Sequence, residues 1–283
     1  MITVVRPTPE RIAELKARIL NPVAAVFDID GTCTKPQLLI EYMLYVVGDL
    51  SPEHGAIVKP IRDALEEYER RRTYDYEPVM RTAVAAIPSF FRGLSFADAA
   101  FNARTVIERF GSMTYMFPRL LIGALRSMPI EERGLIIAIT AQPDFLAEPF
   151  GELHGFDLVY STPYEVVDGR FTGERDDRTI FHKGEVLDEI IATFKLHAQR
   201  CLAVGDSSGD IPMLERVGWA YGVNPKGKLF DWIRRNPSYW VNDAQANGVT
   251  IFTSGPNRKF VETCLDDALP DYVPRFDLPN CNS

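Results

Sequence analysis

An apolar run at residues 23–27 ends abruptly in Asp28-Ile29-Asp30-Gly31-Thr32. Five apolar residues led in by Pro22 and ended by charge and glycine predict a strand buried on both faces, as in a parallel sheet covered by helices. The two carboxylates then follow the strand's carboxyl end, where open parallel sheets bind their ligands. Residues i and i+2 of an extended segment point the same way, so Asp28 and Asp30 can face one site. Such a pair suits a divalent cation, or a nucleophile beside a proton donor, although Asp and Gly are also ordinary residues of solvated turns.

Later segments repeat this placement of polar groups at the ends of elements. The apolar run 135–139 ends in Thr140, and the run 201–205 leads into Asp206-Ser207-Ser208-Gly209-Asp210. Lys183 stands at the start of a helical stretch, residues 184–196. A hydroxyl, an ammonium group and further carboxylates at such ends would form a site for a phosphate and its metal ion.

These four motifs, in this order, resemble those of the haloacid dehalogenase superfamily of aspartate-nucleophile phosphohydrolases. Segments 141–145 (Ala-Gln-Pro-Asp-Phe) and 168–173 (Asp-Gly-Arg-Phe-Thr-Gly) are most similar to the phosphoserine-phosphatase-like branch. The similarity covers roughly the predicted core, about half of the chain. It implies an α/β fold: a Rossmann-like, doubly wound parallel sheet with an all-helical cap inserted between the first and second motifs.

The resemblance also implies a reaction, the hydrolysis of a small phosphorylated metabolite through an aspartyl-phosphate. Asp28 would be the nucleophile, and Asp30 would protonate the leaving group and then activate water. Mg²⁺ would be held by Asp28, Asp206 and the backbone carbonyl of Asp30. The remaining implied roles are phosphate binding by Thr140, Lys183 and the Gly31 amide, and support from Asp210 and Ser207.

Simpler interpretations exist for three of these residues. Lys183 could be a surface lysine, Thr140 could merely end a strand, and Asp210 could be the N-cap of a short helix. Because all the motifs occur together, we expect the catalytic arrangement.

The substrate is less well defined. Phosphoserine phosphatases carry a carboxylate nine residues after the nucleophile, and here that position is Gln37, with Glu41 one turn further on. An amide cannot neutralise a substrate ammonium group, which makes phosphoserine a poor match. Arg81 and Arg92 are candidates for binding a substrate carboxylate from the cap.

Periodicity divides the chain into three parts. Residues 1–34 and 113–243 alternate strands with helices and are expected to form the core, including a hairpin with an Asp168-Gly169 turn. Residues 35–112 are helical in pattern and form the predicted cap, with helices at 77–91 and 96–110 that end near Gly93 and Gly111. Residues 244–283 form a C-terminal extension, in which 261–269 is predicted as a helix and the prolines from Pro270 onward as a segment along the surface.

Bulk properties narrow the class of protein. A net charge of −8 argues against nucleic acid as the main partner, and the longest apolar stretch, residues 38–47, contains Glu41 and is too short for a bilayer. The four cysteines show no spacing typical of a metal site or a disulfide framework, and the N-terminus has no signal pattern, so we expect a cytoplasmic protein. The sequence does not predict its oligomeric state. Hydrolysis is the favoured function. A phosphotransferase or mutase with the same intermediate, and a non-catalytic binding protein with this fold, remain as alternatives.

Overall fold

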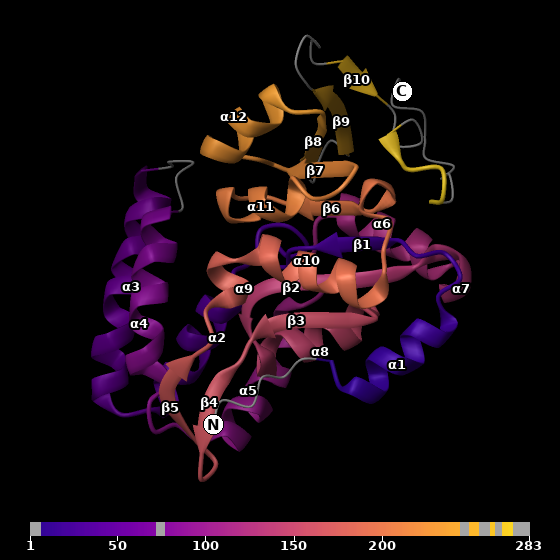
Figure 1. The fold of residues 1–283 in the computed structure, drawn as a ribbon. Coiled ribbons are helices and arrows are strands. Elements are labelled where there is room, and N and C mark those ends of the chain that lie inside the picture. Colours follow the sequence, from indigo (N-terminus) through magenta and orange to yellow (C-terminus); the bar gives the residue numbers. More distant parts are fainter. Residues whose placement is uncertain (1–6, 72–76, 244–248, 255–260, 264–267, 274–283) are drawn as a thin grey trace.

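The computed structural model describes residues 7–71, 77–243, 249–254, 261–263 and 268–273. Its centre is an eight-stranded sheet in the order β10-β9-β8-β7-β6-β1-β2-β3 (Figure 1). The six strands from β8 to β3 run parallel to one another, whereas β9 pairs antiparallel with both β8 and β10. The strands are β1 (Ala24–Phe27), β2 (Leu135–Pro143), β3 (Leu158–Thr162), β6 (Leu202–Gly205), β7 (Trp219–Val223), β8 (Ser238–Asp243), β9 (Val249–Ser254) and β10 (Val261–Thr263). The predicted α/β class with a doubly wound sheet is therefore confirmed.

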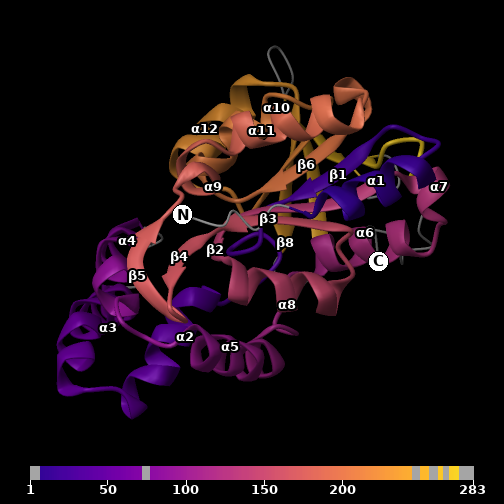
Figure 2. The same ribbon diagram turned by 60° about the horizontal axis from the view of Figure 1, so that its bottom comes forward.

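Helices cover both faces of the sheet (Figure 2). On one face, Ala24 and Val26 of β1 pack in an apolar cluster with residues of α1 (Pro9–Arg18), α10 (Lys183–Phe194), α11 (Ile211–Leu214) and α12 (Gly227–Arg235). On the other, Ala25 and Phe27 pack with α6 (Met116–Arg126) and α8 (Asp144–His154). This alternation is what a strand with two buried faces requires. Short helices α7 (Ile130–Arg133), α9 (Arg178–Phe181), η1 (Val47–Asp49), η2 (Ala198–Arg200) and η3 (Ser208–Asp210) complete the connections. Among the described residues, no helix is both long and apolar enough to cross a membrane.

Four helices between β1 and β2 form what we call the helical insert: α2 (Leu38–Val46), α3 (Pro52–Arg71), α4 (Glu77–Phe91) and α5 (Phe96–Phe110). The bounds of α4 and α5 match the prediction. Ser95 caps α5, because its Oγ accepts a hydrogen bond from the Asp98 amide, and Gly111 follows the helix as predicted.

The insert is joined to the rest of the fold by the hairpin β4 (Tyr164–Val167) and β5 (Arg170–Arg175), which extends beside α4 and α5 (Figure 2). The Gly93 amide donates to the Phe171 carbonyl at 2.8 Å, and the Phe171 amide donates to the Leu94 carbonyl at 3.0 Å. The Phe91 ring lies 5.3 Å from that of Phe171 and 5.5 Å from that of Phe145 in α8. Insert and sheet thus share one continuous apolar cluster.

Two predictions for the C-terminal region were wrong. Residues 261–263 are a strand and not the start of a helix, because they pair with β9, a tertiary contact that local pattern does not show. Of the segment predicted to lie along the surface from Pro270 onward, residues 270–273 are described, and Pro270 and Val273 are buried although Asp271 is exposed. Just before this segment, Ala268 is buried and its carbonyl accepts a hydrogen bond from the Tyr221 hydroxyl. Residues 264–267 and 274–283 of this region lie outside the described residues.

Candidate active site

The candidate site lies where the chain direction across the sheet reverses. From β1 the chain continues through β2 and β3 on one side, and β6, β7 and β8 lie on the other. Asp28 follows β1 and Asp206 follows β6, and these two strands are adjacent and parallel. A crevice at such a switch point is the usual ligand site of open α/β sheets.

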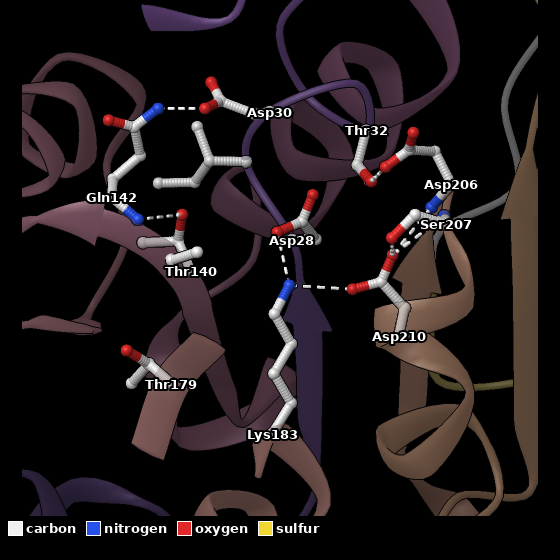
Figure 3. A network of polar contacts seen from close by, with 12 residues as sticks. Asp28, Asp30, Thr32, Thr140, Gln142, Thr179, Lys183, Asp206, Ser207 and Asp210 are labelled. Atoms are coloured by element: carbon white, nitrogen blue, oxygen red, sulfur yellow. Dashed lines mark hydrogen bonds and ion pairs between the residues drawn. The ribbon is translucent and has the colours of Figure 1, made fainter. Parts of the chain in front are cut away.

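Lys183 joins two of the predicted carboxylates (Figure 3). Its Nζ lies 2.6 Å from Oδ1 of Asp28 and 2.7 Å from Oδ1 of Asp210. All three side chains are buried, and Asp210 is completely so. Burial raises the pKa of Asp28 to about 6, an effect that Lys183 opposes. Burial lowers the pKa of Lys183, but the charges of Asp210 and Asp28 outweigh this effect and raise the pKa, so that Lys183 stays charged and suits an anionic ligand.

Asp210 also organises the loop after β6. Its Oδ2 accepts hydrogen bonds from the amides of Asp206 and Ser207, at 3.1 and 3.0 Å, and from the Ser207 hydroxyl at 3.1 Å. Because Lys183 donates to Oδ1 of Asp210, both oxygens of this carboxylate accept hydrogen bonds. Asp210 thus orients Lys183 and the loop, and Ser207 contacts Asp210.

Asp206 lies directly against the first motif. The Thr32 hydroxyl donates to its Oδ1 at 3.0 Å, and a Cβ at Gly31 would lie 2.4 Å from its Oδ2. Gly31 also has a φ of 79°, a left-handed conformation that glycine adopts without strain. Burial and then the charge of Asp210 raise the pKa of Asp206 well above its ordinary value.

The carboxylates fit a divalent cation. One oxygen each from Asp28, Asp206 and Asp210 lies within 4.8 Å of the others. Hard carboxylate oxygens in this number are typical ligands of Mg²⁺, and a bound cation would offset the cost of burying several like charges. Because Asp210 is engaged elsewhere, Asp28 and Asp206 are the carboxylates best placed to hold the ion.

Asp30 is held apart from Asp28 by partners of its own (Figure 3). Its Oδ1 accepts from the Leu38 amide at 3.2 Å and lies 3.3 Å from the Thr34 hydroxyl. Its Oδ2 accepts from the side-chain amide of Gln142. Burial, followed by the charge of Asp28, raises the pKa of Asp30 to about 7. A carboxyl group with such a pKa can both give and take a proton near neutral pH.

Thr140 is buried at the carboxyl edge of β2, where its hydroxyl oxygen accepts from the Gln142 amide at 3.2 Å. A hydroxyl that accepts in this way keeps its own hydrogen for another acceptor, such as a phosphoryl oxygen.

The four specificity candidates lie outside this network. Gln37 precedes α2, and Glu41 lies in the first turn of α2, where burial raises its pKa and Arg109 opposes the rise. Arg81 of α4 and Arg92, which directly follows that helix, are exposed. Sequence reasoning gave no role to Thr32 or Gln142. Thr32 could have been noticed within the first motif, and Gln142 within segment 141–145, although the resemblance of that segment to the phosphoserine-phosphatase-like branch implied no role for the glutamine.

Comparisons with known proteins agree with this geometry. The family model of haloacid dehalogenase-like hydrolases matches residues 25–215. The chain is 40% identical over 99 residues to the "Inhibition of morphological differentiation protein" of Streptomyces azureus, covering 34% of this chain and 35% of that protein. It is 34% identical over 108 residues to "Phosphoserine phosphatase SerB1" of Mycobacterium tuberculosis, covering 37% of this chain and 35% of that protein. Each match thus spans about a third of the relative's length.

A similar fold occurs in solved structures. A phosphoserine phosphatase with a phospho-aspartyl intermediate analogue superimposes with a TM-score of 0.52 at 19% identity, covering 75% of this chain and 90% of that one. The family model spans most of the predicted core, including all four motifs. The chain therefore belongs to the haloacid dehalogenase-like hydrolases.

Proposed function

We propose that this protein is a Mg²⁺-dependent phosphatase that hydrolyses a small phosphorylated metabolite through an aspartyl-phosphate on Asp28. The arrangement of Asp28, Lys183 and Asp206 at the switch point carries this proposal. It provides a buried carboxylate nucleophile, a fixed cation for the phosphoryl oxygens and a pair of carboxylates for the metal. The phosphatase named among the relatives and the phosphatase structure of similar fold support the same chemistry.

The residues divide the reaction between them. Asp28 attacks phosphorus while Asp30 gives a proton to the departing ester oxygen, and Asp30 then takes a proton from the water that cleaves the aspartyl-phosphate. Lys183 and the Thr140 hydroxyl bind phosphoryl oxygens, together with the Gly31 amide. Mg²⁺, when bound by Asp28, Asp206 and the Asp30 carbonyl, supplies charge neutralisation. We place the protein in the cytoplasm.

Phosphoserine is not the substrate we favour. Gln37 offers an amide where a carboxylate would be needed, and the nearby Glu41 has a raised pKa. An ammonium group bound there would lack a full countercharge. A phosphate ester without an amine fits these residues better.

Phosphate release from a panel of phosphomonoesters tests the proposal, with Mg²⁺ or EDTA and with Asp28→Asn as the matched control. We expect release that requires Mg²⁺, disappears in Asp28→Asn and is weaker with phosphoserine than with esters lacking an amine. Transfer of the phosphoryl group to an added alcohol in place of water would indicate a phosphotransferase. Absence of release or transfer with every ester would contradict the proposal and favour a binding protein.

A further inference from the structure

We propose that Gln142 is a positioning residue that holds Asp30 for proton transfer to the leaving oxygen. This inference rests on the proposed phosphatase function and extends it to a residue outside the four motifs. Gln142 does not touch the reacting atoms in this account; it acts through the carboxylate of Asp30.

The first observation is that Gln142 touches two functional groups at once. Its side-chain Nε2 donates to Oδ2 of Asp30, and its backbone amide donates to the Thr140 hydroxyl oxygen at 3.2 Å (Figure 3). The residue is 2% exposed. One buried residue therefore connects the proposed proton donor to the proposed phosphate-binding hydroxyl.

The backbone explains how Gln142 reaches Asp30. Strand β2 continues three residues past Thr140 to Pro143, and its pairing with β3 shifts register between Ile139 and Pro143. Such an irregularity changes where side chains point and is common beside active sites. Thr162 of β3 supports the segment, since its hydroxyl donates to the Ala141 carbonyl at 3.0 Å.

The two carboxylate oxygens of Asp30 accept hydrogen bonds from different parts of the chain. Oδ1 is bound by the segment that enters α2, through the Leu38 amide and the Thr34 hydroxyl. Among the described residues, Gln142 is the side chain that binds Oδ2. Without it, the carboxyl group would be held on one oxygen only and could rotate away from the ester oxygen. Proton transfer requires hydrogen-bond reach, so such rotation directly weakens catalysis.

The side-chain carbonyl oxygen of Gln142 shows that an amide is unfavourable for packing at this buried position. Oε1 of Gln142 is buried and has no hydrogen-bond partner among the described residues. A buried acceptor without a partner is destabilising, and an apolar side chain of similar size would avoid that cost. Packing therefore does not explain the glutamine, whereas its donor to Asp30 does.

If Gln142 positions Asp30, it should affect the transfer of the Asp30 proton to the leaving ester oxygen. As the Asp28 oxygen bonds to phosphorus, the bond from phosphorus to the ester oxygen breaks, and the proton of Asp30 moves to that oxygen. The products are a neutral alcohol, the aspartyl-phosphate and an ionised Asp30, whose carboxylate accepts the Gln142 N–H. A leaving group that is a weak base needs this proton little, and a more basic one needs it strongly.

Two aryl esters of similar size separate this role from a purely structural one. We would measure kcat/KM with Mg²⁺ for phenyl phosphate, whose leaving group is the more basic, and for p-nitrophenyl phosphate. For Gln142→Met, which keeps the volume and removes the donor, we expect a loss about 10-fold greater with phenyl phosphate. Asp30→Asn should show the same preference more strongly, and adding Gln142→Met to it should cause no further selective loss. Gln142→Asn, whose amide is one methylene short of Asp30, is the second variant should Gln142→Met fail to fold.

Thr162→Val is the matched control, because it perturbs the same end of β2 without touching Asp30. We expect it to change kcat/KM for both esters by the same factor. Equal losses with both esters in Gln142→Met and Gln142→Asn would overturn the inference while leaving the phosphatase function intact. If wild type does not accept the aryl pair, two accepted esters of the panel that differ in leaving-group basicity take their place, and a wild type that releases no phosphate from any ester would contradict the proposed function, and the inference with it.

Discussion

The Nζ atom of Lys183 lies 2.6 Å from Oδ1 of Asp28, and both side chains are buried. In Lys183→Met, Asp28 and Asp210 would remain buried without their cation. Removing one partner of a buried ion pair costs about 3–5 kcal/mol, so we expect a loss of that order in urea unfolding. Phosphate release should fall by about 100-fold or more, because a fixed cation for the phosphoryl group is lost.

The double variant Lys183→Met/Asp210→Asn separates the two effects. Removing one carboxylate charge should restore part of the free energy of unfolding and none of the activity. Activity close to wild type in Lys183→Met would contradict the role assigned to Lys183.

Gly31 offers a test of the space beside Asp206. In Gly31→Ala, the new Cβ would lie 2.4 Å from Oδ2 of Asp206, so the carboxylate must move. Gly93→Ala is the matched control, because its φ of 80° is nearly the same and a Cβ added there would meet no atom within 4 Å. Both variants should lose about 1–2 kcal/mol of stability from backbone strain. Only Gly31→Ala should require more Mg²⁺ for phosphate release, and equal Mg²⁺ requirements in the two variants would count against Asp206 as a ligand.

Phe91 tests how firmly the helical insert is joined to the sheet. Its ring contacts Phe145 of α8 and Phe171 of the hairpin, and it is fully buried. Phe91→Ala should cost about 3–5 kcal/mol, and insert and core should unfold in one transition. Phe101→Ala, at a position in α5 that is 72% exposed, should stay within about 0.5 kcal/mol of wild type. Two separate transitions in thermal unfolding of the wild type would show that the insert is an independent unit.

His154 should make stability depend on pH. Its Nε2 lies 2.8 Å from the Gly111 carbonyl, and burial together with nearby Arg126 lowers its pKa, although the hydrogen bond opposes this. The unfolded chain then binds a proton more readily than the folded one, so stability is lost as pH falls through the ordinary histidine value. We expect wild type to lose more unfolding free energy than His154→Gln between pH 8 and pH 5. Parallel curves for the two proteins would contradict the lowered pKa.

Much of the fold follows from local pattern. The buried run before Asp28, the Ser95 cap and the Asp168-Gly169 turn are signals that a few neighbouring residues determine. Asp28 and Asp206 could also be expected to converge, because the carboxyl ends of adjacent parallel strands meet at one edge. Lys183, at the start of α10, meets Asp28 there.

Other parts of the structure depend on tertiary contacts that the local sequence pattern does not show. Strand β10 has three residues and depends on β9 for its conformation. Gln142 follows the apolar part of β2 and would ordinarily be assigned to a loop; only the path of the chain between Asp30 and Leu38 places a carboxylate against it. The contact between Gln142 and Asp30 joins residues that are 112 positions apart in the sequence.

Trapping the covalent intermediate tests the central claim most directly. Wild-type protein would be mixed with a good phosphomonoester substrate and Mg²⁺, quenched in acid within one turnover, and analysed by intact mass and peptide mapping. We predict the added mass of one phosphoryl group, located on Asp28 and missing in Asp28→Asn. Rapid phosphate release without any phosphorylated protein, or a phosphoryl group on another residue, would contradict the account.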